Sequence, residues 1–443
     1  MFLKTQPNSE KPMTEILALL QNIAHLIEKT TFKQMSRIVY AILASSGRIT
    51  MLGLSRWAEK GGSYRTIQRF YCIFLPWAAL HWKLFRSCFL ESDDEYIAAG
   101  DESIVSKAGK QTHGLDRFFA GLQQRVIPGL SFFAFSLVNV REEHSYPLHI
   151  TQTVKSVEEK AASKVKVEAR KNRKKQEKKK PGRPKGSKNK EKKEVVLNPE
   201  LIRIQKSLQA FLNIIKGQIN LIYLAMDGRF GNYPSAFMVR QAGLHLISKL
   251  RFDAALYETR SVEGYKKRGP KPKYGVKLDI GKINPKYLKE TSVENCIRTE
   301  IYQGQFLNKE FAFALNVVVV IKTNLETARV AHVILFSTDT GLTYDKMIKF
   351  YSLRFQLEFN FRDAKQYWGL EDFMNVKEIA VTNAANLSFF MVNFSHALPK
   401  PYRKQDDEYS ILDLKSHYRG LRYAAETIKM LPEKPDRILL AEI

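Results

Sequence analysis

The spacing of apolar residues changes twice along the chain, and this change limits the possible folds more than any other feature. Up to about Leu90 apolar residues recur every three or four positions, which is typical of amphipathic helices. Beyond Asp94 they alternate or run continuously, as in strands, and helical spacing returns between about Asp339 and Asn393. We therefore predict three parts: a helical domain over residues 1–93, an α/β domain over 94–395 and a helical tail over 396–443.

The predicted α/β domain has a distinctive order of elements. Strand-like runs at Tyr96–Asp101, Leu130–Val140 and Tyr146–Gln152 imply a meander of three strands. They are followed by an amphipathic helix at Leu201–Ile215 and by an apolar run at Ile219–Met226, which is typical of a buried central strand. This order matches a ribonuclease-H-like core. The mostly strand-like residues 254–340 would then form a β-rich insertion in that core.

The charge balance indicates a polyanionic partner. Lys and Arg total 71 against 45 Asp and Glu, a formal net charge of +26. Such an excess favours double-stranded DNA or another nucleic acid. No apolar run approaches the roughly 20 residues needed to span a bilayer, so no membrane partner is expected. No glycine-rich loop precedes Lys-Ser or Lys-Thr, so no nucleotide cofactor is expected either.

Half of the net charge comes from one segment. Between Lys155 and Lys193 there are 18 Lys and Arg residues against 5 Glu. Self-repulsion and few apolar residues predict a flexible or partly helical insert over residues 154–199. The run Pro181-Gly-Arg183-Pro184 in this insert resembles an AT-hook, whose arginine enters narrow minor grooves. Non-specific phosphate contact by Arg183 and a purely solubilising linker are the alternatives.

A second candidate DNA contact lies in the helical domain. Two helical stretches flank the glycine-bearing turn at Gly61-Gly62, and Ser63 is a suitable N-cap for the second of them. Arg65 and Arg69 would lie on that second helix, as in a helix-turn-helix reader of DNA. Two packed helices with solvated arginines would give the same pattern, so both interpretations stay open.

Four polar residues near the end of the α/β domain share a helical face. On one continuous helix, Tyr351, Arg354, Glu358 and Lys365 would fall within an arc of about 60°. An apolar stripe runs beside this arc, so the helix can pack on a sheet while presenting a carboxylate flanked by cations. A surface helix on which Glu358 merely pairs with Arg354 or Arg362 is the alternative.

The spacing Tyr351-x2-Arg354-x3-Glu358-x6-Lys365 resembles the signature of the bacterial insertion-sequence-four transposases, the Tn-five-like group of DDE transposases. Two further segments are similar to this family. In Gly100-Asp101-Glu102 an Asp closes a strand ahead of a basic glycine loop, and Met226-Asp227-Gly-Arg-Phe-Gly231 follows a buried strand. The resemblance implies that Asp101, Asp227 and Glu358 form the catalytic triad.

The resemblance also implies a metal-dependent reaction. Phosphodiester cleavage by such enzymes uses two divalent ions about 3.5–4 Å apart, and three carboxylates would select Mg²⁺ or Mn²⁺. Asp101 would bridge both ions, with Asp227 on one and Glu358 on the other. Glu102 is a rival for the first position, but it should point to the opposite face of its strand. Asp253 and Asp363 are rivals for the later positions.

By the same resemblance, Tyr351, Arg354 and Lys365 would contact phosphates near the end of the transposon, with Arg354 suited to bidentate grip. Formation of a hairpin at the cut end would need an aromatic side chain that stacks on a flipped base. No Trp lies between Asp227 and Glu358. The candidates in that interval are Tyr257, Tyr265, Tyr274, Tyr287 and Tyr302, and the sequence does not choose among them.

The sequence therefore predicts a transposase that binds terminal inverted repeats and catalyses DNA cleavage and strand transfer. We expect it to act as a homodimer on DNA, in the bacterial cytoplasm and associated with the nucleoid. The odd number of scattered cysteines, three in all, agrees with a reducing compartment. The alternatives are an inactive, transposase-derived DNA-binding protein and a ribonuclease-H-like nuclease with no transfer step.

Overall fold

A computed structural model describes residues 11–58, 61–121, 123–173, 195–260, 273–398 and 410–432. Its first part is helical. Side chains cap two of these helices: Thr50 accepts a hydrogen bond from Gly53 N, and Ser63 accepts one from Thr66 N. The elements before the sheet are α1 (Lys11–Leu20), η2 (Gln21–Leu26), α2 (Lys29–Ala44), α3 (Met51–Trp57), α4 (Tyr64–Cys72) and α5 (Trp77–Cys88).

Five strands form the centre of the sheet, in the order β4-β3-β1-β5-β6. Strands β1, β3 and β4 pair antiparallel, whereas β5 and β6 run parallel to β1. This order, with α7 and α8 as the intervening helices, is that of a ribonuclease-H-like core. The bounds are β1 (Tyr96–Ser106), β3 (Arg125–Asn139), β4 (His144–Gln152), α7 (Pro199–Ile215), β5 (Tyr223–Met226), α8 (Tyr233–Gln241) and β6 (His245–Lys249).

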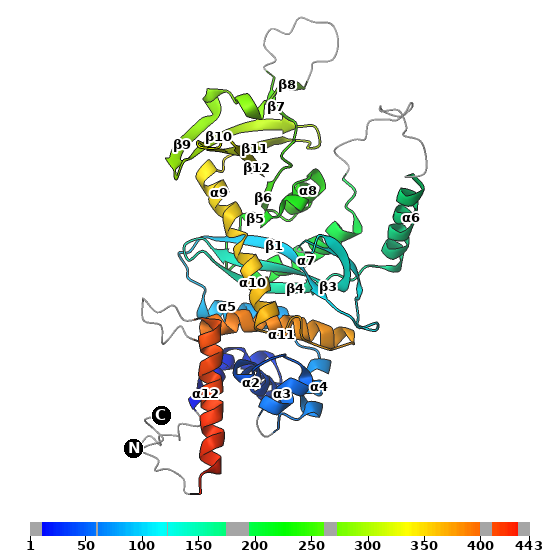
Figure 1. Cartoon of the computed structure of the whole chain (residues 1–443), viewed down its shortest axis with the longest axis vertical. Coiled ribbons are helices and arrows are strands. Elements are labelled where there is room, and N and C mark those ends of the chain that lie inside the picture. The colour runs from blue at the N-terminus through cyan, green and yellow to red at the C-terminus, as the bar shows by residue number, and fades with distance from the viewer. Residues whose placement is uncertain are drawn as a thin grey trace, which may run out of the picture.

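The strands after β6 continue the same sheet. Strand β12 pairs antiparallel with β6, and β11 and β10 follow it outwards, so twelve strands join in the described residues. Residues 254–340 are thus strand-rich, as expected, and extend the core sheet rather than folding apart from it (Figure 1). Their bounds are β7 (Leu256–Thr259), β8 (Tyr274–Lys277), η4 (Ile280–Lys282), η5 (Pro285–Tyr287), β9 (Leu288–Glu294), β10 (Ile297–Asn308), β11 (Ala314–Asn324) and β12 (Val330–Ser337).

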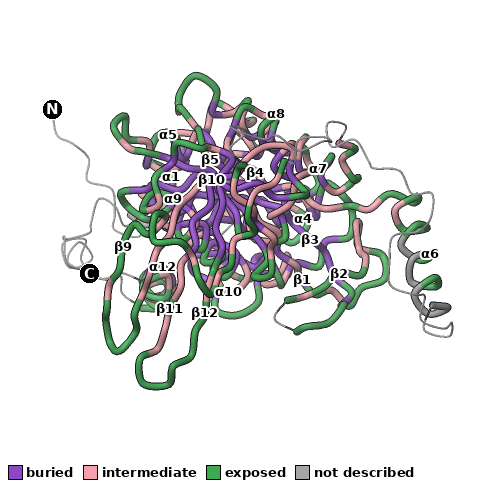
Figure 2. Tube along the Cα trace, turned by 90° about the horizontal axis from the view of Figure 1, so that it is seen from above, coloured by how far each residue is buried: buried purple, intermediate pink, exposed green. Residues whose placement is uncertain are grey.

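Helices cover both faces of the sheet. One face of β1, with Ile97 and Ala99, belongs to the core formed with α9 (Tyr344–Leu353), α10 (Gln356–Gln366) and α11 (Glu378–Ala397). The other face, with Tyr96 and Ala98, packs in the core that contains α5, α7 and α8. In Figure 2 the buried residues fill the centre, while α6 (Val157–Arg173) and the hairpin ends of β9, β11 and β12 lie exposed at the periphery.

The N-terminal helices have no core separate from the rest. They share one core with α11, whose residues are almost all buried, and with α12 (Ile411–Met430). Trp77 Nε1 donates to Asn383 Oδ1 on α11 at 2.7 Å, and Lys415 Nζ of α12 donates to Ile42 O of α2 at 2.8 Å. Figure 1 shows α11 lying between the sheet and the N-terminal helices, with α12 running alongside them.

Several expectations about single elements need correction. Strand β1 runs on to Ser106, so Asp101 lies within the strand and does not close it. The strand predicted at Ile219–Met226 spans only Tyr223–Met226, because Gly217 at φ 74° turns the chain after α7 and the next residues remain partly exposed. Strand β2 (Asp116–Ala120), which pairs with β3, was not expected. Tyr351 to Lys365 do not form one continuous helix, because the chain tightens at Arg354 and Phe355 between α9 and α10.

Candidate active site

Asp101 and Asp227 lie on neighbouring parallel strands. The register pairs Gly100 of β1 with Met226, the last residue of β5; Asp101 is the next residue of β1, and Asp227 directly follows β5. Ala99 and Ala225, two residues before each aspartate, belong to the core beneath α10. Because side chains alternate along a strand, both aspartates are directed to the face of the sheet on which α10 packs.

Glu102 occupies the opposite face, as the alternation requires. It accepts hydrogen bonds from Ser131 Oγ and, at 3.4 Å, from Thr153 Oγ1, and it pairs with Arg229 at 2.9 Å. The other two rivals also lie outside the group. Asp253 forms an exposed ion pair with Arg251, and the buried Asp363 pairs with its neighbour Arg362.

Glu358 lies in the first turn of α10, on the side of the helix that faces Asp101. The hydrogen bonds Phe355 N to Ser352 O, Leu357 N to Arg354 O and Glu358 N to Phe355 O all span three residues, which is the tight 3₁₀ pattern. This turn changes the helical phase between Tyr351 and Glu358, so the single-helix arc predicted from the sequence is wrong in detail. Glu358 nevertheless stands beside Arg354, which places it next to Asp101.

Arg354 connects two of the three carboxylates. Its Nη1 lies 2.9 Å from Asp101 Oδ2, and its Nη2 lies 3.3 Å from Glu358 Oε1. The Arg354 side chain is only 10% exposed and that of Asp101 21%, so this pair is shielded from solvent, whereas Glu358 is 43% exposed. The predicted alternative, a surface helix with Glu358 paired to Arg354, therefore accounts for one bond but not for the convergence on Asp101.

The electrostatics of the site are set mainly by the burial of Asp101. Burial raises the pKa of Asp101 to about 6, the nearby Arg354 lowers it in part, and the charges of Asp227 and Glu358 raise it further. Burial likewise raises the pKa of the Tyr351 hydroxyl, against the effect of Arg354. A cation held beside these carboxylates would offset the cost of burying their negative charge.

Lys365, the last of the four residues predicted to share a helical face, contacts the backbone of β1. Its Nζ donates to the carbonyl oxygen of Ile104, three residues beyond Asp101 on β1, at 2.8 Å. Burial lowers the pKa of this ammonium group. Lys365 thus ties α10 to β1 in this structure, in addition to any contact with phosphate.

The donor chemistry of the site fits hard divalent cations. Asp101, Asp227 and Glu358 offer only carboxylate oxygens, the ligands preferred by Mg²⁺ and Mn²⁺. In the arrangement described, Arg354 supplies the positive charge between Asp101 and Glu358. Within the described residues, no three metal-ligating side chains are gathered closely enough to hold an ion as they stand.

The predicted DNA contacts outside this centre are dispersed. Arg65 and Arg69 are exposed on α4, whose buried residues Ile67 and Phe70 pack against the helical core. Arg183 and Tyr265 lie outside the described residues. Tyr257, Tyr274 and Tyr302 are in the outer strands, and the rings of the first two lie 5.3 Å apart. Tyr287 ends η5, where it packs on Phe306.

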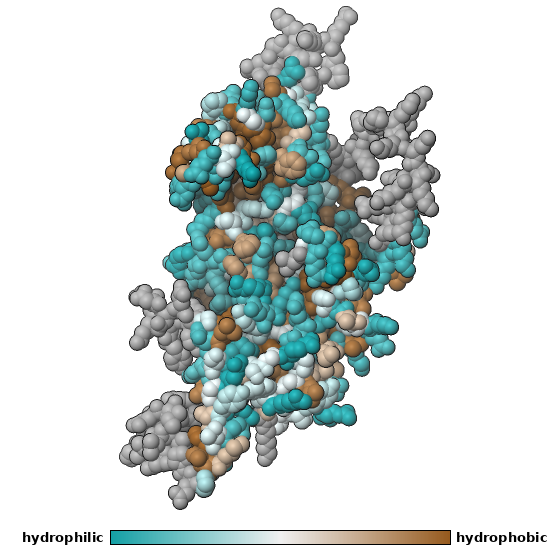
Figure 3. Space-filling model, viewed as in Figure 1, coloured by the Kyte–Doolittle hydropathy of each residue, from teal (hydrophilic) through white to brown (hydrophobic). Residues whose placement is uncertain are grey.

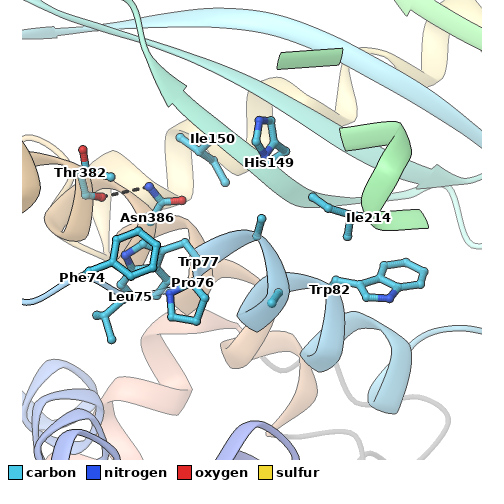
Figure 4. A pocket seen from close by; sticks show the side chains of 12 residues that line it. Phe74, Leu75, Pro76, Trp77, Trp82, His149, Ile150, Ile214, Thr382 and Asn386 are labelled. Atoms are coloured by element: carbon cyan, nitrogen blue, oxygen red, sulfur yellow. Dashed lines mark hydrogen bonds between the residues drawn. The ribbon is translucent and has the colours of Figure 1, made fainter. Parts of the chain in front are cut away.

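Two surface features lie apart from the carboxylates. An apolar pocket of about 590 Å³ opens between α5, β4 and α11, with Trp77, Trp82 and His149 among its lining residues (Figure 4). It contains no carboxylate. Figure 3 shows hydrophobic side chains among hydrophilic ones over β9–β12, where Val293 and Val330 are exposed. Neither feature belongs to the candidate active site.

Sequence reasoning missed one residue beside the site. Arg229, two residues after Asp227, pairs with both Glu102 and Glu200. The only signal in the sequence is the position of an arginine directly after an Asp-Gly pair that closes a strand, which is compatible with many roles.

A family model described as DDE superfamily endonuclease matches residues 21–303, more than half of the chain. The chain belongs to this family. The matched region contains Asp101 and Asp227 and ends before Glu358, so the family match does not cover the predicted third carboxylate. Among the described residues, no helix combines the length and apolar character needed to cross a membrane.

Among solved structures, the DDE endonuclease is similar to a piggyBac transposase in a synaptic complex with hairpin DNA, determined by cryo-electron microscopy. The TM-score is 0.38 and the sequence identity 10%, over 98% of this chain and 83% of that chain. So distant a likeness adds nothing to the fold assignment, which rests on the strand order. No curated protein matches the sequence.

Proposed function

We propose that this DDE endonuclease is a transposase that cuts DNA at the ends of its own insertion sequence and transfers the cut strands to a new site. The observation that carries the proposal is the convergence of Asp101, Asp227 and Glu358 around Arg354 on one face of a ribonuclease-H-like sheet. The spacing of Tyr351, Arg354, Glu358 and Lys365 supports the finer assignment to the insertion-sequence-four group.

The three carboxylates would hold Mg²⁺ or Mn²⁺, which would activate the attacking hydroxyl group and stabilise the leaving oxygen. In the described arrangement Arg354 binds Asp101 and Glu358 instead. With the carboxylates holding metal, the Arg354 guanidinium would be available to bind a phosphate through two hydrogen bonds. Tyr351 and Lys365 border the same centre and would orient the DNA backbone beside it.

Several further assignments belong to this proposal. Residues 1–93 would bind DNA through Arg65 and Arg69 on α4, residues 94–395 would carry out the chemistry, and residues 396–443 would form a tail. The basic insert at residues 154–199, including Arg183, would add contacts to phosphates or to the minor groove. The enzyme would act in the bacterial cytoplasm as a homodimer that bridges two terminal repeats, without a nucleotide cofactor.

The test is a transfer assay on defined DNA. Linear DNA that ends in the inverted repeats flanking the reading frame is incubated with the protein, Mg²⁺ and a supercoiled target plasmid. The proposal predicts nicks at the repeat ends and joined products in the plasmid. Cleavage without joined products would indicate a nuclease with no transfer step. Specific binding to the repeats without cleavage would indicate an inactive DNA-binding protein.

A further inference from the structure

A second ionic cluster lies behind the candidate active site, on the opposite face of β1. Arg229 Nη1 lies 2.9 Å from Glu102 Oε2, and Arg229 Nη2 pairs with Glu200 Oε1 in the first turn of α7. Glu102 is only 15% exposed and also accepts a hydrogen bond from Ser131 on β3. The cluster therefore joins β1, the turn after β5 and α7.

The cluster lies just beyond the point at which the strand pairing between β1 and β5 ends. Strand pairing between β1 and β5 ends at Gly100 and Met226, so Asp227 begins a turn that has no further ladder bonds to β1. The pair between Arg229 and Glu102 connects the residue two positions after Asp227 to the residue next to Asp101. It is thus a direct side-chain link between the two segments that carry the aspartates.

The turn is already fixed on its other side, against β6. Ser248 Oγ donates to the carbonyl oxygen of Asp227 at 3.0 Å. At Gly231 a Cβ atom would lie 2.1 Å from Lys249 O, so only glycine allows the turn to approach β6 this closely. With β6 on one side, the contact of Arg229 with Glu102 determines how far the turn lies from β1.

We propose that Arg229 is a positioning residue that sets the separation of Asp101 and Asp227, and thereby the affinity of the site for divalent cations. This inference rests on the proposed function in one respect, the assignment of these two aspartates as metal ligands. Loss of the Arg229 cation would leave Glu102 and Glu200 facing each other as unneutralised carboxylates. Their repulsion would push β1 away from the first turn of α7, and the turn after β5 would lose its side-chain link to β1, so the two ligands would separate.

The experiment measures Mn²⁺ binding to the full chain without DNA, by isothermal titration calorimetry, together with the Mn²⁺ dependence of DNA cleavage. The variants are Arg229→Gln, Arg229→Lys and Glu102→Gln. The control is Arg251→Gln, which removes an exposed arginine from an ion pair with Asp253 in the loop after β6. Asp227→Asn tests the ligand assignment separately.

We expect Arg229→Gln to weaken Mn²⁺ binding about tenfold, while the cleavage rate at saturating Mn²⁺ stays within about twofold of wild type, because the ligands themselves remain. Arg229→Lys should recover part of the affinity, since an ammonium group can pair with one of the two carboxylates. Glu102→Gln should cause a loss similar to that of Arg229→Gln, and the double variant should add little. The control should leave both quantities unchanged.

Unchanged Mn²⁺ affinity in Arg229→Gln would overturn the inference. So would a loss of cleavage at every Mn²⁺ concentration with normal Mn²⁺ binding, because Arg229 would then act on the DNA. Complete loss of Mn²⁺ binding in Glu102→Gln would make Glu102 a ligand and would equally contradict the inference. If Arg229→Gln fails to fold, Arg229→Lys and Glu102→Gln decide. Normal Mn²⁺ binding by Asp227→Asn would instead refute the ligand assignment in the proposed function.

Discussion

Asp101 is the residue at which the candidate site and the stability of the fold are in conflict. Its pKa rises from 3.8 to about 6 on folding, mainly through burial. Between about pH 4 and pH 6 the folded chain keeps a proton that the unfolded chain releases, so the free energy of unfolding falls as the pH rises through this window. Above about pH 6 the full penalty remains, at most about 3 kcal/mol from a shift of roughly two pKa units.

Asp101→Asn should therefore stabilise the metal-free protein at neutral and alkaline pH. We expect its free energy of unfolding to exceed that of wild type by up to about 3 kcal/mol at pH 8, and the difference to vanish near pH 4. Urea denaturation in EDTA at several pH values measures this. Asp253→Asn, which alters an exposed aspartate, is the control and should change little. Parallel pH curves for Asp101→Asn and wild type would contradict this account of the site.

The separation of Asp101 from Glu102 is the part of the site that sequence predicts best. Strand alternation places adjacent residues on opposite faces, and the structure has Asp101 paired with Arg354 and Glu102 paired with Arg229. The role of Arg229 was not predictable, because its partner Glu102 lies far away in the sequence. Only the folded sheet brings the two side chains together.

Among single elements, α4 carries the clearest prediction about DNA. Ser63 caps the helix and Ile67 anchors it, which leaves Arg65 and Arg69 exposed on the surface. If both arginines contact phosphates, the variant Arg65→Ala/Arg69→Ala should bind DNA at least about tenfold more weakly at low salt. The plot of log affinity against log salt concentration should also become shallower by about 2. Fluorescence anisotropy at a series of KCl concentrations measures both.

The control for α4 is Arg86→Ala, which removes an exposed arginine near the end of α5. It should leave the salt dependence as in wild type. An unchanged slope in the double variant would support the other interpretation of the sequence, two packed helices whose arginines are merely solvated. Thermal unfolding should be unaffected in both the double variant and the control, because these arginine side chains are not part of the core.

The break between α9 and α10 shows what helical spacing alone does not reveal. Neither Gly nor Pro marks Arg354 and Phe355, and both residues keep right-handed helical dihedral angles. The break differs from a regular α-helix only in its hydrogen bonds, which join residues three positions apart instead of four. This tighter turn rotates Glu358 relative to Tyr351. In the folded protein the same turn places Arg354 against Asp101, a contact that no local pattern in the sequence indicates.

At the scale of the whole molecule, the N-terminal helices and the catalytic core are packed as one unit. Asn383 on α11 accepts from Trp77 Nε1 and donates to the carbonyl oxygens of Tyr71 and Ile73. The sequence predicted these helices from their spacing, but not the shared core, because α11 and α12 reach them from the other end of the chain. The extension of the sheet from β6 to β12 escaped prediction for the same reason, since such pairings join residues far apart in sequence.

We therefore expect one cooperative unfolding transition rather than two. Asn383→Ala removes the partner of two buried groups and one partly buried group, and should lower the free energy of unfolding by about 2–3 kcal/mol, with the whole transition shifting to lower temperature. Differential scanning calorimetry measures this, and Asn213→Ala on the exposed side of α7 is the matched control. If calorimetry resolves two transitions and Asn383→Ala shifts only one of them, the N-terminal helices and the core unfold independently.

The central claim is that Asp101, Asp227 and Glu358 form one metal-dependent nuclease centre. The most direct test measures Mg²⁺- and Mn²⁺-dependent cleavage of DNA carrying the terminal repeats, with wild type, Asp101→Asn, Asp227→Asn, Glu358→Gln and the control Asp253→Asn. The account predicts that each of the three site variants loses cleavage by at least about a thousandfold while still folding, and that the control cuts at the wild-type rate. Cleavage at the wild-type rate by any one of the three site variants would contradict it.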